Sequence, residues 1–235
     1  MVAPGEAVGL SASARPYVSR GGEKLEAALD RFGVDPAGRD CLDAGASTGG
    51  FTDCLLQRGA ARVAAVDVGY GQLAWPIRQD PRVLVLERTN LRELQASTLP
   101  FRPTLVTADL SFISLRLVVP TLAGVAVDEA RTDLVLLVKP QFEAGPRLVG
   151  RGGVVRDPDV WRRAVVAVAE AGREAGFLPL GVMASPLLGP AGNVEFLLHA
   201  ARPERGAEPA VSWLEGFEPD AAMAEGIALA GRPAS

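Results

Sequence analysis

The sequence predicts an α/β protein with a doubly wound, mostly parallel seven-stranded sheet and helices on both faces. Seven short runs rich in valine, leucine and alanine alternate with helical segments along the 235 residues. These runs lack the polar alternation of half-exposed strands, as is typical of parallel strands covered on both faces. The first run, residues 40–44, leads into a glycine-rich turn that opens a helix, which is the usual start of such a sheet.

Each predicted element has its own signal. The predicted strands are residues 40–44, 63–67, 83–87, 105–108, 134–139, 178–184 and 194–200. The predicted helices are 23–32, 51–58, about 158–175 and, more weakly, 221–230. Gly33 is a favourable C-cap for the first helix, and Asp157 with Pro158 forms a favourable start for the long one.

The length of the chain suits one α/β domain with short appendages. We expect residues 1–14 to form a disordered leader because they are small and polar. Residues 15–202 are predicted to form the domain. Residues 203–235, polar and proline-rich at first, are predicted to form a C-terminal extension with the weak helix.

The turn after the first strand predicts an adenosine cofactor. The apolar run after it ends in Asp67, placed to accept hydrogen bonds from ribose hydroxyls. The turn itself reads Asp43-x-Gly45-x-Ser47-x-Gly49 rather than G-x-G-x-x-G. An acidic residue there repels a pyrophosphate but attracts the ammonium of an amino-acid-bearing cofactor, so we predict S-adenosylmethionine. The alternative is an ordinary strand–turn–helix that happens to contain glycines.

Further cofactor contacts follow from position along the chain. We expect Ser47, Thr48 and Gly49 to surround the carboxylate of the methionine group near a helix start. Thr89 and Asn90, after the third strand, are placed to border the adenine. The larger apolar residues nearby are expected to belong to the core, namely Phe51, Leu73 and Trp75.

Cysteine and histidine usage argues against several other chemistries. Cys41 and Cys54 lie in apolar surroundings and are expected to be small buried hydrophobes rather than a disulfide or a nucleophile. His199, the single histidine, sits in an apolar strand, which disfavours metal sites and His-dependent triads. No apolar run is long enough for a membrane span and no secretory signal is evident, so we expect a cytoplasmic protein without membrane contact.

The net charge of −4 provides no overall attraction to a polyanion. Two local groups of basic residues nevertheless occur. The first, near the N-terminus, is Arg15, Arg20 and Lys24, and the second, around a glycine-rich loop, is Arg147, Arg151 and Arg156. Either group is a candidate basic patch or ordinary solvated surface.

Charged residues stand where four predicted strands end. Asp43, Asp67, Asp109 and Lys139 each end or directly follow an apolar run. In a doubly wound sheet the ligand lies beyond the carboxyl ends of the strands. A charge there has no packing role that offsets its desolvation, so we predict functional roles, with a surface salt bridge as the alternative for each.

Further segments are too specific for scaffolding. Together with the cofactor turn they are DAGASTGGFTD, DVGYGQLAW, ERTN, ADLSFIS, LVKPQFE, GRGGVVRDP and SPLLGPAGNVEF, preceded by SRGGEKL. On these motifs the chain, over about residues 15–201, resembles the TlyA or hemolysin A-like family within the FtsJ-like ribose 2′-O-methyltransferases. The resemblance implies methyl transfer from S-adenosylmethionine to a ribose 2′-hydroxyl, that of a cytidine, in ribosomal RNA.

The resemblance also implies a catalytic tetrad of Lys24, Asp109, Lys139 and Glu195. A ribose hydroxyl is a poor nucleophile, so the enzyme must align it and remove one proton. A free lysine has a pKa of about 10.4, and burial beside a second cation favours the neutral amine that a base requires. We therefore expect Lys139 to be the base and Lys24 the neighbouring cation, with the two carboxylates as orienting groups and Asp109 also bordering the cofactor. Phe112 is a candidate for stacking on the target base.

The resemblance leaves the acceptor open. Members of this family typically carry a small RNA-binding domain ahead of the methyltransferase, and we expect none here because about 14 residues precede Arg15. The acceptor is therefore ribosomal RNA or a ribosomal subunit, or else a small molecule with a hydroxyl or amine. A cofactor-binding protein without methyl transfer is a further alternative. A pore-forming role is disfavoured because no amphipathic basic helix is evident, and the oligomeric state is not predicted.

Overall fold

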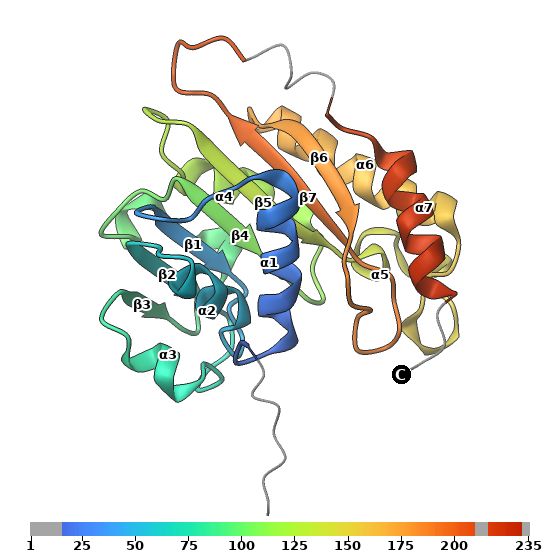
Figure 1. Cartoon of the computed structure of the whole chain (residues 1–235), viewed down its shortest axis with the longest axis horizontal. Coiled ribbons are helices and arrows are strands. Elements are labelled where there is room, and N and C mark those ends of the chain that lie inside the picture. The colour runs from blue at the N-terminus through green and yellow to red at the C-terminus, as the bar shows by residue number, and fades with distance from the viewer. Residues whose placement is uncertain (1–15, 210–215, 232–235) are drawn as a thin grey trace, which may run out of the picture.

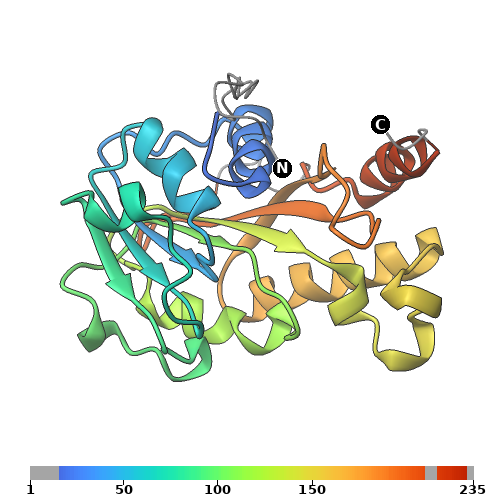
Figure 2. The same cartoon turned by 90° about the horizontal axis from the view of Figure 1, so that it is seen from below.

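The computed structural model of the protein describes residues 16–209 and 216–231. They form three layers, in which helices cover both faces of a central sheet (Figures 1 and 2). The predicted leader, residues 1–14, lies outside the described residues. None of the helices in the described ranges is long and apolar enough to cross a membrane.

The sheet is seven-stranded in the order β3-β2-β1-β4-β5-β7-β6. Pairing is parallel from β3 through β5, whereas β7 runs antiparallel to both of its neighbours. This confirms the predicted doubly wound, mostly parallel sheet. Because the order of the strands along the chain reverses beside β1, the loops that leave β1 and β4 diverge and open a crevice at the carboxyl ends of the strands. The strands are β1 Asp40–Ala44, β2 Arg62–Val66, β3 Val83–Leu86, β4 Leu105–Ala108, β5 Thr132–Val138, β6 Leu178–Ala184 and β7 Phe196–Arg202.

The helices divide between the two faces of the sheet (Figure 2). Helices α1 and α2 pack on one face, where Leu25 and Leu55 are buried against Val63. Helices α4 and α6 pack on the other, where Leu122 and Val165 belong to a second core. The helices are α1 Arg20–Phe32, α2 Gly50–Gln57, α3 Trp75–Gln79, α4 Val119–Val125, α5 Pro140–Glu143, α6 Pro158–Glu174 and α7 Pro219–Ala230.

Helix α7 is packed against the domain. It contacts β6 and α6, and its Met223 is buried. Glu225 accepts a hydrogen bond from the backbone N–H of Ala184 at 2.9 Å and pairs with Arg31 of α1 at 3.1 Å. The weak helix predicted at 221–230 is therefore present, and the division of the chain at residue 203 stays a prediction.

Helices α1 and α2 meet through glycines at their first turns. A Cβ added to Gly50 would lie 2.1 Å from the Ser19 Oγ, and one added to Gly22 would lie 2.2 Å from the Tyr17 ring. No real Cβ tolerates such distances, so only glycine allows this approach. Ser19 is the N-cap of α1, and its hydroxyl accepts a hydrogen bond from the N–H of Gly21. The contact brings the start of α1 to the glycine-rich turn.

Gly22→Ala should lower the free energy of unfolding by about 1–3 kcal/mol, because the new methyl group overpacks the Tyr17 contact. Gly124→Ala is the matched control, since a Cβ at this exposed position of α4 meets nothing within 4 Å. It should raise the stability by about 0.5–1 kcal/mol through helix propensity alone. Urea unfolding of both variants measures the difference, and equal effects would show that the packing of Tyr17 on the first turn of α1 does not depend on glycine at position 22.

Candidate active site

The pleat of the strands places the strand-end charges on one face of the sheet. Successive side chains of a strand point to opposite faces. In β1 the neighbours of Asp43, Leu42 and Ala44, belong to the core under α4 and α6. Asp43 therefore points to the face that α1 and α2 cover. The same alternation applies after β4 and β5, so Asp109 and Lys139 point to that face too.

Glu195 reaches the same place from the antiparallel strand. Val138 of β5 pairs with Phe196 of β7, so the next residues along each strand, Lys139 and Glu195, continue the register opposite each other. Lys24 comes from α1, which lies over this part of the sheet (Figure 1). Residues far apart in the sequence are thus brought to one edge of the sheet.

The four residues of the predicted tetrad form two ion pairs. The Nζ of Lys139 lies 2.5 Å from Oδ1 of Asp109 and donates to the Oγ of Ser111 at 3.0 Å. The Nζ of Lys24 lies 2.5 Å from Oε2 of Glu195, and these two side chains are 8% and 1% exposed. Charges this buried are expensive to desolvate unless they are paired, so the pairs define a specific site rather than solvated surface.

The distribution of lysine along the chain is a further signal for the same two positions. Lys24 and Lys139 are the only lysines in the chain, and every other basic residue is an arginine. An ammonium group can lose its proton near neutrality when its surroundings favour the neutral amine, whereas a guanidinium cannot. Both lysines of the chain therefore belong to the predicted tetrad.

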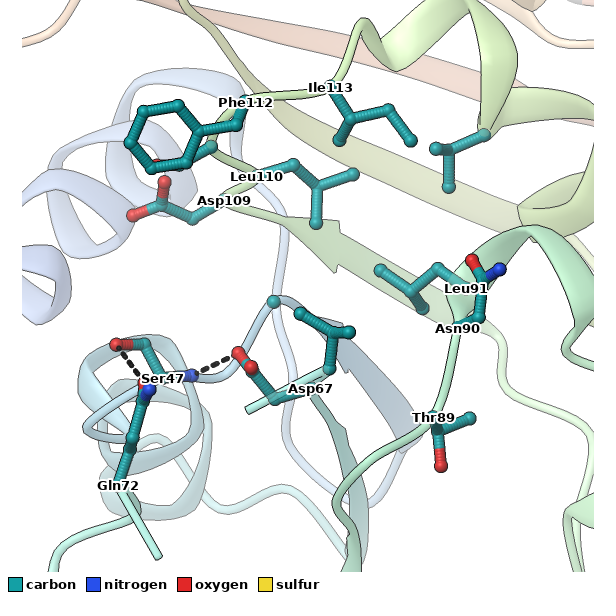
Figure 3. Close-up of a pocket in the computed structure, with 14 residues that line it drawn as sticks. Ser47, Asp67, Gln72, Thr89, Asn90, Leu91, Asp109, Leu110, Phe112 and Ile113 are labelled. Atoms are coloured by element: carbon teal, nitrogen blue, oxygen red, sulfur yellow. Dashed lines mark hydrogen bonds between the residues drawn. The ribbon is translucent and has the colours of Figure 1, made fainter. Parts of the chain in front are cut away.

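A cavity of about 450 Å³ opens beside Asp109, the carboxylate of the first pair (Figure 3). Asp67 and Ser47 form one side of it, Thr89 and Asn90 another, and Asp109 a third. Its size is within the range of small-molecule and cofactor sites. Six of the predicted cofactor-binding positions thus line one cavity, and one of the six, Asp109, also belongs to the tetrad.

Asp67 holds the glycine-rich turn while it faces the cavity. Its Oδ2 accepts a hydrogen bond from the N–H of Ser47 at 2.8 Å, and its Oδ1 accepts one from the N–H of Gly69 at 2.6 Å. Gly45, at a φ of 86°, is equally constrained, because a Cβ there would lie 2.5 Å from the carbonyl oxygen of Asp109. The turn after β1 and the loop after β4 are therefore in direct contact.

Three predicted cofactor residues do not line this cavity. Asp43 is fully buried beneath it, Thr48 is exposed, and Gly49 is buried against Leu73 and Ile77. The Oδ2 of Asp43 accepts a hydrogen bond from the hydroxyl of Thr52 at 2.6 Å. Their roles at the cofactor stay predictions.

Asp43 has an unsatisfied acceptor. Among the described residues its Oδ1 has no hydrogen-bond partner although it is buried. Burial raises the pKa of Asp43 to about 7, opposed by the Thr52 hydrogen bond, and the charges of Asp109 and Asp67 raise it further. A buried carboxylate with a free oxygen behind the glycine-rich turn fits a cationic group in the bound ligand.

A second carboxylate, Glu143, was not singled out from the sequence. It follows Lys139 by one turn of α5 and its side chain is 1% exposed. Its Oε1 accepts a hydrogen bond from the N–H of Leu115 at 2.7 Å, and its Oε2 accepts one from the Ser114 hydroxyl at 2.5 Å. Glu143 thus ties the loop that carries Ser111 and Phe112 to the helix after Lys139. Its place in LVKPQFE was the available signal.

Several other expectations have clear outcomes. Phe51 and Leu73 are buried as predicted, but Trp75 is 70% exposed and the prediction that it belongs to the core is wrong. Trp75 begins the five-residue helix α3 at the edge of the sheet, where little lies over it. Cys41 and Cys54 are buried free cysteines, and burial raises the pKa of each thiol to about 12.

His199 is buried and does not belong to a cluster of metal ligands. Its Nε2 lies 2.9 Å from Oδ1 of Asp133, which Arg39 contacts as well. The described residues contain no group of three or more histidine, cysteine or acidic side chains able to hold a metal ion. The contacts among His199, Asp133 and Arg39 lie at the start of β5, at the end of the strands opposite the cavity.

The strand order, the glycine-rich turn after β1 and the acidic residue after β2 define a Rossmann-like class I methyltransferase. The FtsJ-like methyltransferase family matches residues 17–202. The chain belongs to this family and, within it, to the TlyA proteins.

Individual relatives agree with this assignment. The chain is 60% identical over 186 residues to the 16S/23S rRNA (cytidine-2′-O)-methyltransferase TlyA of Mycobacterium tuberculosis. The aligned region covers 79% of this chain and 69% of that protein. A crystal structure of a protein described as a hemolysin from Lactococcus lactis superposes with a TM-score of 0.82 at 43% identity, covering 89% of this chain and 97% of that one. An S-adenosylmethionine-dependent methyltransferase from Mesorhizobium loti, 17% identical with a TM-score of 0.53 over 76% of this chain and 97% of that one, shares the fold.

The raised pKa of Asp43 predicts a specific pH dependence of stability. The unfolded carboxyl group ionises near pH 4, whereas the folded one keeps its proton until about pH 7. Between these values the folded state binds more protons, so this group destabilises the fold as pH rises, by about 4 kcal/mol in total. Asp43→Asn removes this contribution. Urea unfolding at pH 5 and pH 8 should show the wild type losing stability relative to the variant, and a constant difference would contradict the assignment.

Glu143→Ala should loosen the loop after β4. Alanine removes both acceptor oxygens, so the buried N–H of Leu115 and the hydroxyl of Ser114 lose their partner, at a cost of about 1–3 kcal/mol. Hydrogen exchange at the N–H of Leu115 should accelerate by about tenfold or more, while exchange at Val66 in β2 stays the same. Unchanged exchange at Leu115 would show that Glu143 does not hold this loop.

Proposed function

We propose that the protein transfers a methyl group from S-adenosylmethionine to the 2′-hydroxyl of a cytidine ribose in ribosomal RNA. The observation that supports this most directly is that Asp109 lies on the wall of the cofactor-sized cavity and is paired with Lys139. The Lys24–Glu195 pair adds a second lysine and carboxylate, because Glu195 continues the register opposite Lys139. The name of the TlyA relative provides the acceptor, because that protein is a 16S/23S rRNA (cytidine-2′-O)-methyltransferase.

The cavity fits the proposed cofactor in both shape and charge. Asp67 would hold the ribose hydroxyls, and Thr89 and Asn90 would border the adenine. Ser47 lies near the start of α2, where backbone donors suit a carboxylate, and Asp43 has its free oxygen for an ammonium. When bound, S-adenosylmethionine supplies a methyl group activated by a sulfonium.

The tetrad would handle the proton of the acceptor. In its neutral form, Lys139 would accept the proton of the 2′-hydroxyl as the oxygen becomes bonded to carbon. Asp109, 2.5 Å away, would stabilise the ammonium that results, and Ser111 would keep the Nζ in place. Lys24, held by Glu195, would provide a second positive charge on the same face of the sheet.

Phe112 would contact the base of the target nucleotide. Its side chain is 91% exposed although it is aromatic, and its backbone has a φ of 65°. Its ring lies 5.2 Å from that of Phe142, and it belongs to the wall of the cavity next to Asp109 (Figure 3). An exposed ring held in an unfavourable backbone conformation beside the acceptor site is suited to stacking on an unpaired base.

Two lysine-to-arginine variants separate the proposed roles, because arginine keeps the charge but cannot act as a base. Lys139→Arg should lower the rate of methyl transfer to ribosomal RNA by about 10²–10⁴-fold. Lys24→Arg should lose less, since its proposed role requires only charge. Transfer of tritium from labelled S-adenosylmethionine measures both rates, and cofactor binding checks that each variant is folded.

The same assay tests the acceptor when it is run on ribosomal subunits, naked ribosomal RNA and a small-molecule extract. Incorporation into RNA, resistant to base hydrolysis at the methylated ribose, supports the proposal. Incorporation only into the small molecules, or full activity of Lys139→Arg, would overturn it.

A further inference from the structure

The proposed acceptor is a polyanion, yet the chain has a net charge of −4. Binding of RNA depends strongly on neutralising phosphates with lysine or arginine. The acceptor side of the site must therefore contain exposed cations that are not already neutralised by carboxylates. The sequence contains two groups of basic residues, and they differ in how far their cations are already paired within the protein.

The N-terminal basic group is largely unavailable. Arg15 lies outside the described residues. Arg20 donates to the backbone carbonyl of Leu188 at 2.9 Å. Lys24 is buried in its ion pair with Glu195 and belongs to the catalytic site. Of its two described members, only Arg20 is at the surface, and its guanidinium is partly engaged.

The second group lies on the loop between α5 and α6, residues 145–157, which we call the arginine loop. Its Arg147, Arg151 and Arg156 are exposed. Among the described residues, none of these three guanidinium groups has a hydrogen bond, ion pair or ring contact. The loop contains one acidic residue, Asp157, whose side chain caps α6 by accepting from the N–H of Asp159. The loop thus combines three unneutralised positive charges with one engaged carboxylate.

The loop is fastened to the catalytic strands at both of its ends. It begins after α5, the helix that directly follows Lys139. Near its other end, the side chain of Asn193 accepts a hydrogen bond from the N–H of Val155 and donates one to the carbonyl of Gly153, each at 2.9 Å. Asn193 is 2% exposed and precedes Glu195 by two residues. A buried side chain therefore holds the backbone of the loop, at Gly153 and Val155, close to the segment that carries Glu195.

The outer side of the loop is open to a large ligand. Gly152 and Gly153 have φ values of 77° and 76°, and a Cβ at either position would meet nothing within 4 Å. The backbone of the loop is closed on itself by hydrogen bonds from Gly150 to Val154 and from Gly153 to Gly150. A compact, unobstructed loop presents its arginines without first having to be ordered.

We propose that the arginine loop binds backbone phosphates of the RNA that flank the methylated nucleotide. This inference rests on the proposed function, because it takes the acceptor to be RNA. The contacts would be electrostatic and independent of base sequence, and they would position the ribose at Lys139. Asn193 would be a positioning residue that holds the loop in register with the tetrad.

The test measures binding of a fluorescein-labelled, 20-nucleotide single-stranded RNA at several salt concentrations. The test variant combines Arg147→Gln, Arg151→Gln and Arg156→Gln. Each phosphate contact in a single strand contributes about 0.7 to the slope of log K against log salt, so this variant should lose about 2 from that slope. Its dissociation constant at about 0.1 M salt should rise by about tenfold or more, while its affinity for S-adenosylmethionine stays that of the wild type.

The matched control combines Arg62→Gln, Arg82→Gln and Arg205→Gln. These exposed arginines stand where β2 and β3 begin and after β7 ends, which is the opposite edge of the sheet. They change the net charge by the same amount but break exposed ion pairs that contribute little to stability. The control should keep the slope of the wild type. Equal slopes for both triple variants would overturn the proposal.

Methyl transfer separates this proposal from the proposed function. If the wild type transfers no methyl group to RNA but the slope still depends on the arginine loop, the proposed function fails and the RNA-binding loop stands. If the wild type methylates RNA and the test variant binds RNA like the control, the proposed function stands and the loop proposal is wrong.

Discussion

The ion pair between Lys139 and Asp109 is the interaction on which the arrangement of the site depends. It joins the carboxyl ends of β4 and β5, and both groups are largely withdrawn from water. An unpaired charge at either position would be costly, so each residue requires the other. The same pair lies where the turn after β1 approaches most closely, because Gly45 packs against the backbone of Asp109. The glycine-rich turn and the Lys139–Asp109 pair therefore meet at one residue, Asp109.

Helix α1 completes the site through close packing rather than through charge alone. The glycines at the first turns of α1 and α2 allow these helices to approach, and Val18 is held by a 2.8 Å hydrogen bond from its N–H to Asp53 of α2. Lys24 consequently lies over the strand ends, where Glu195 neutralises it. The motif SRGGEKL thus contains the small residues that let α1 approach α2 and the lysine that pairs with Glu195.

Two buried polar residues organise the acceptor side without belonging to the tetrad. Glu143 holds the loop that carries Ser111 and Phe112, and Asn193 holds the arginine loop. Each has its hydrogen-bonding groups satisfied by backbone or hydroxyl partners, so each loop has one defined position. Both lie within a few residues of Lys139 or Glu195 in the chain, so each links its loop to the end of a strand that carries a predicted tetrad residue.

Sequence by itself determined the fold class, the strands 40–44, 105–108 and 178–184 to the residue, and the charges at the strand ends, which are Asp43, Asp67, Asp109 and Lys139. It did so because buried parallel strands read as short apolar runs, and because a charge that ends such a run has few structural reasons to be there. Tertiary structure decided the rest. Strand β5 begins at Thr132 and β7 ends at Arg202, two residues beyond the predicted bounds, because these two residues pair with each other. The extent of a strand is set by its cross-strand hydrogen bonds and not by hydropathy alone. The exposure of Trp75, the burial of Asp43 beneath the cavity and the roles of Glu143 and Asn193 all depend on contacts between distant segments, which local pattern does not contain.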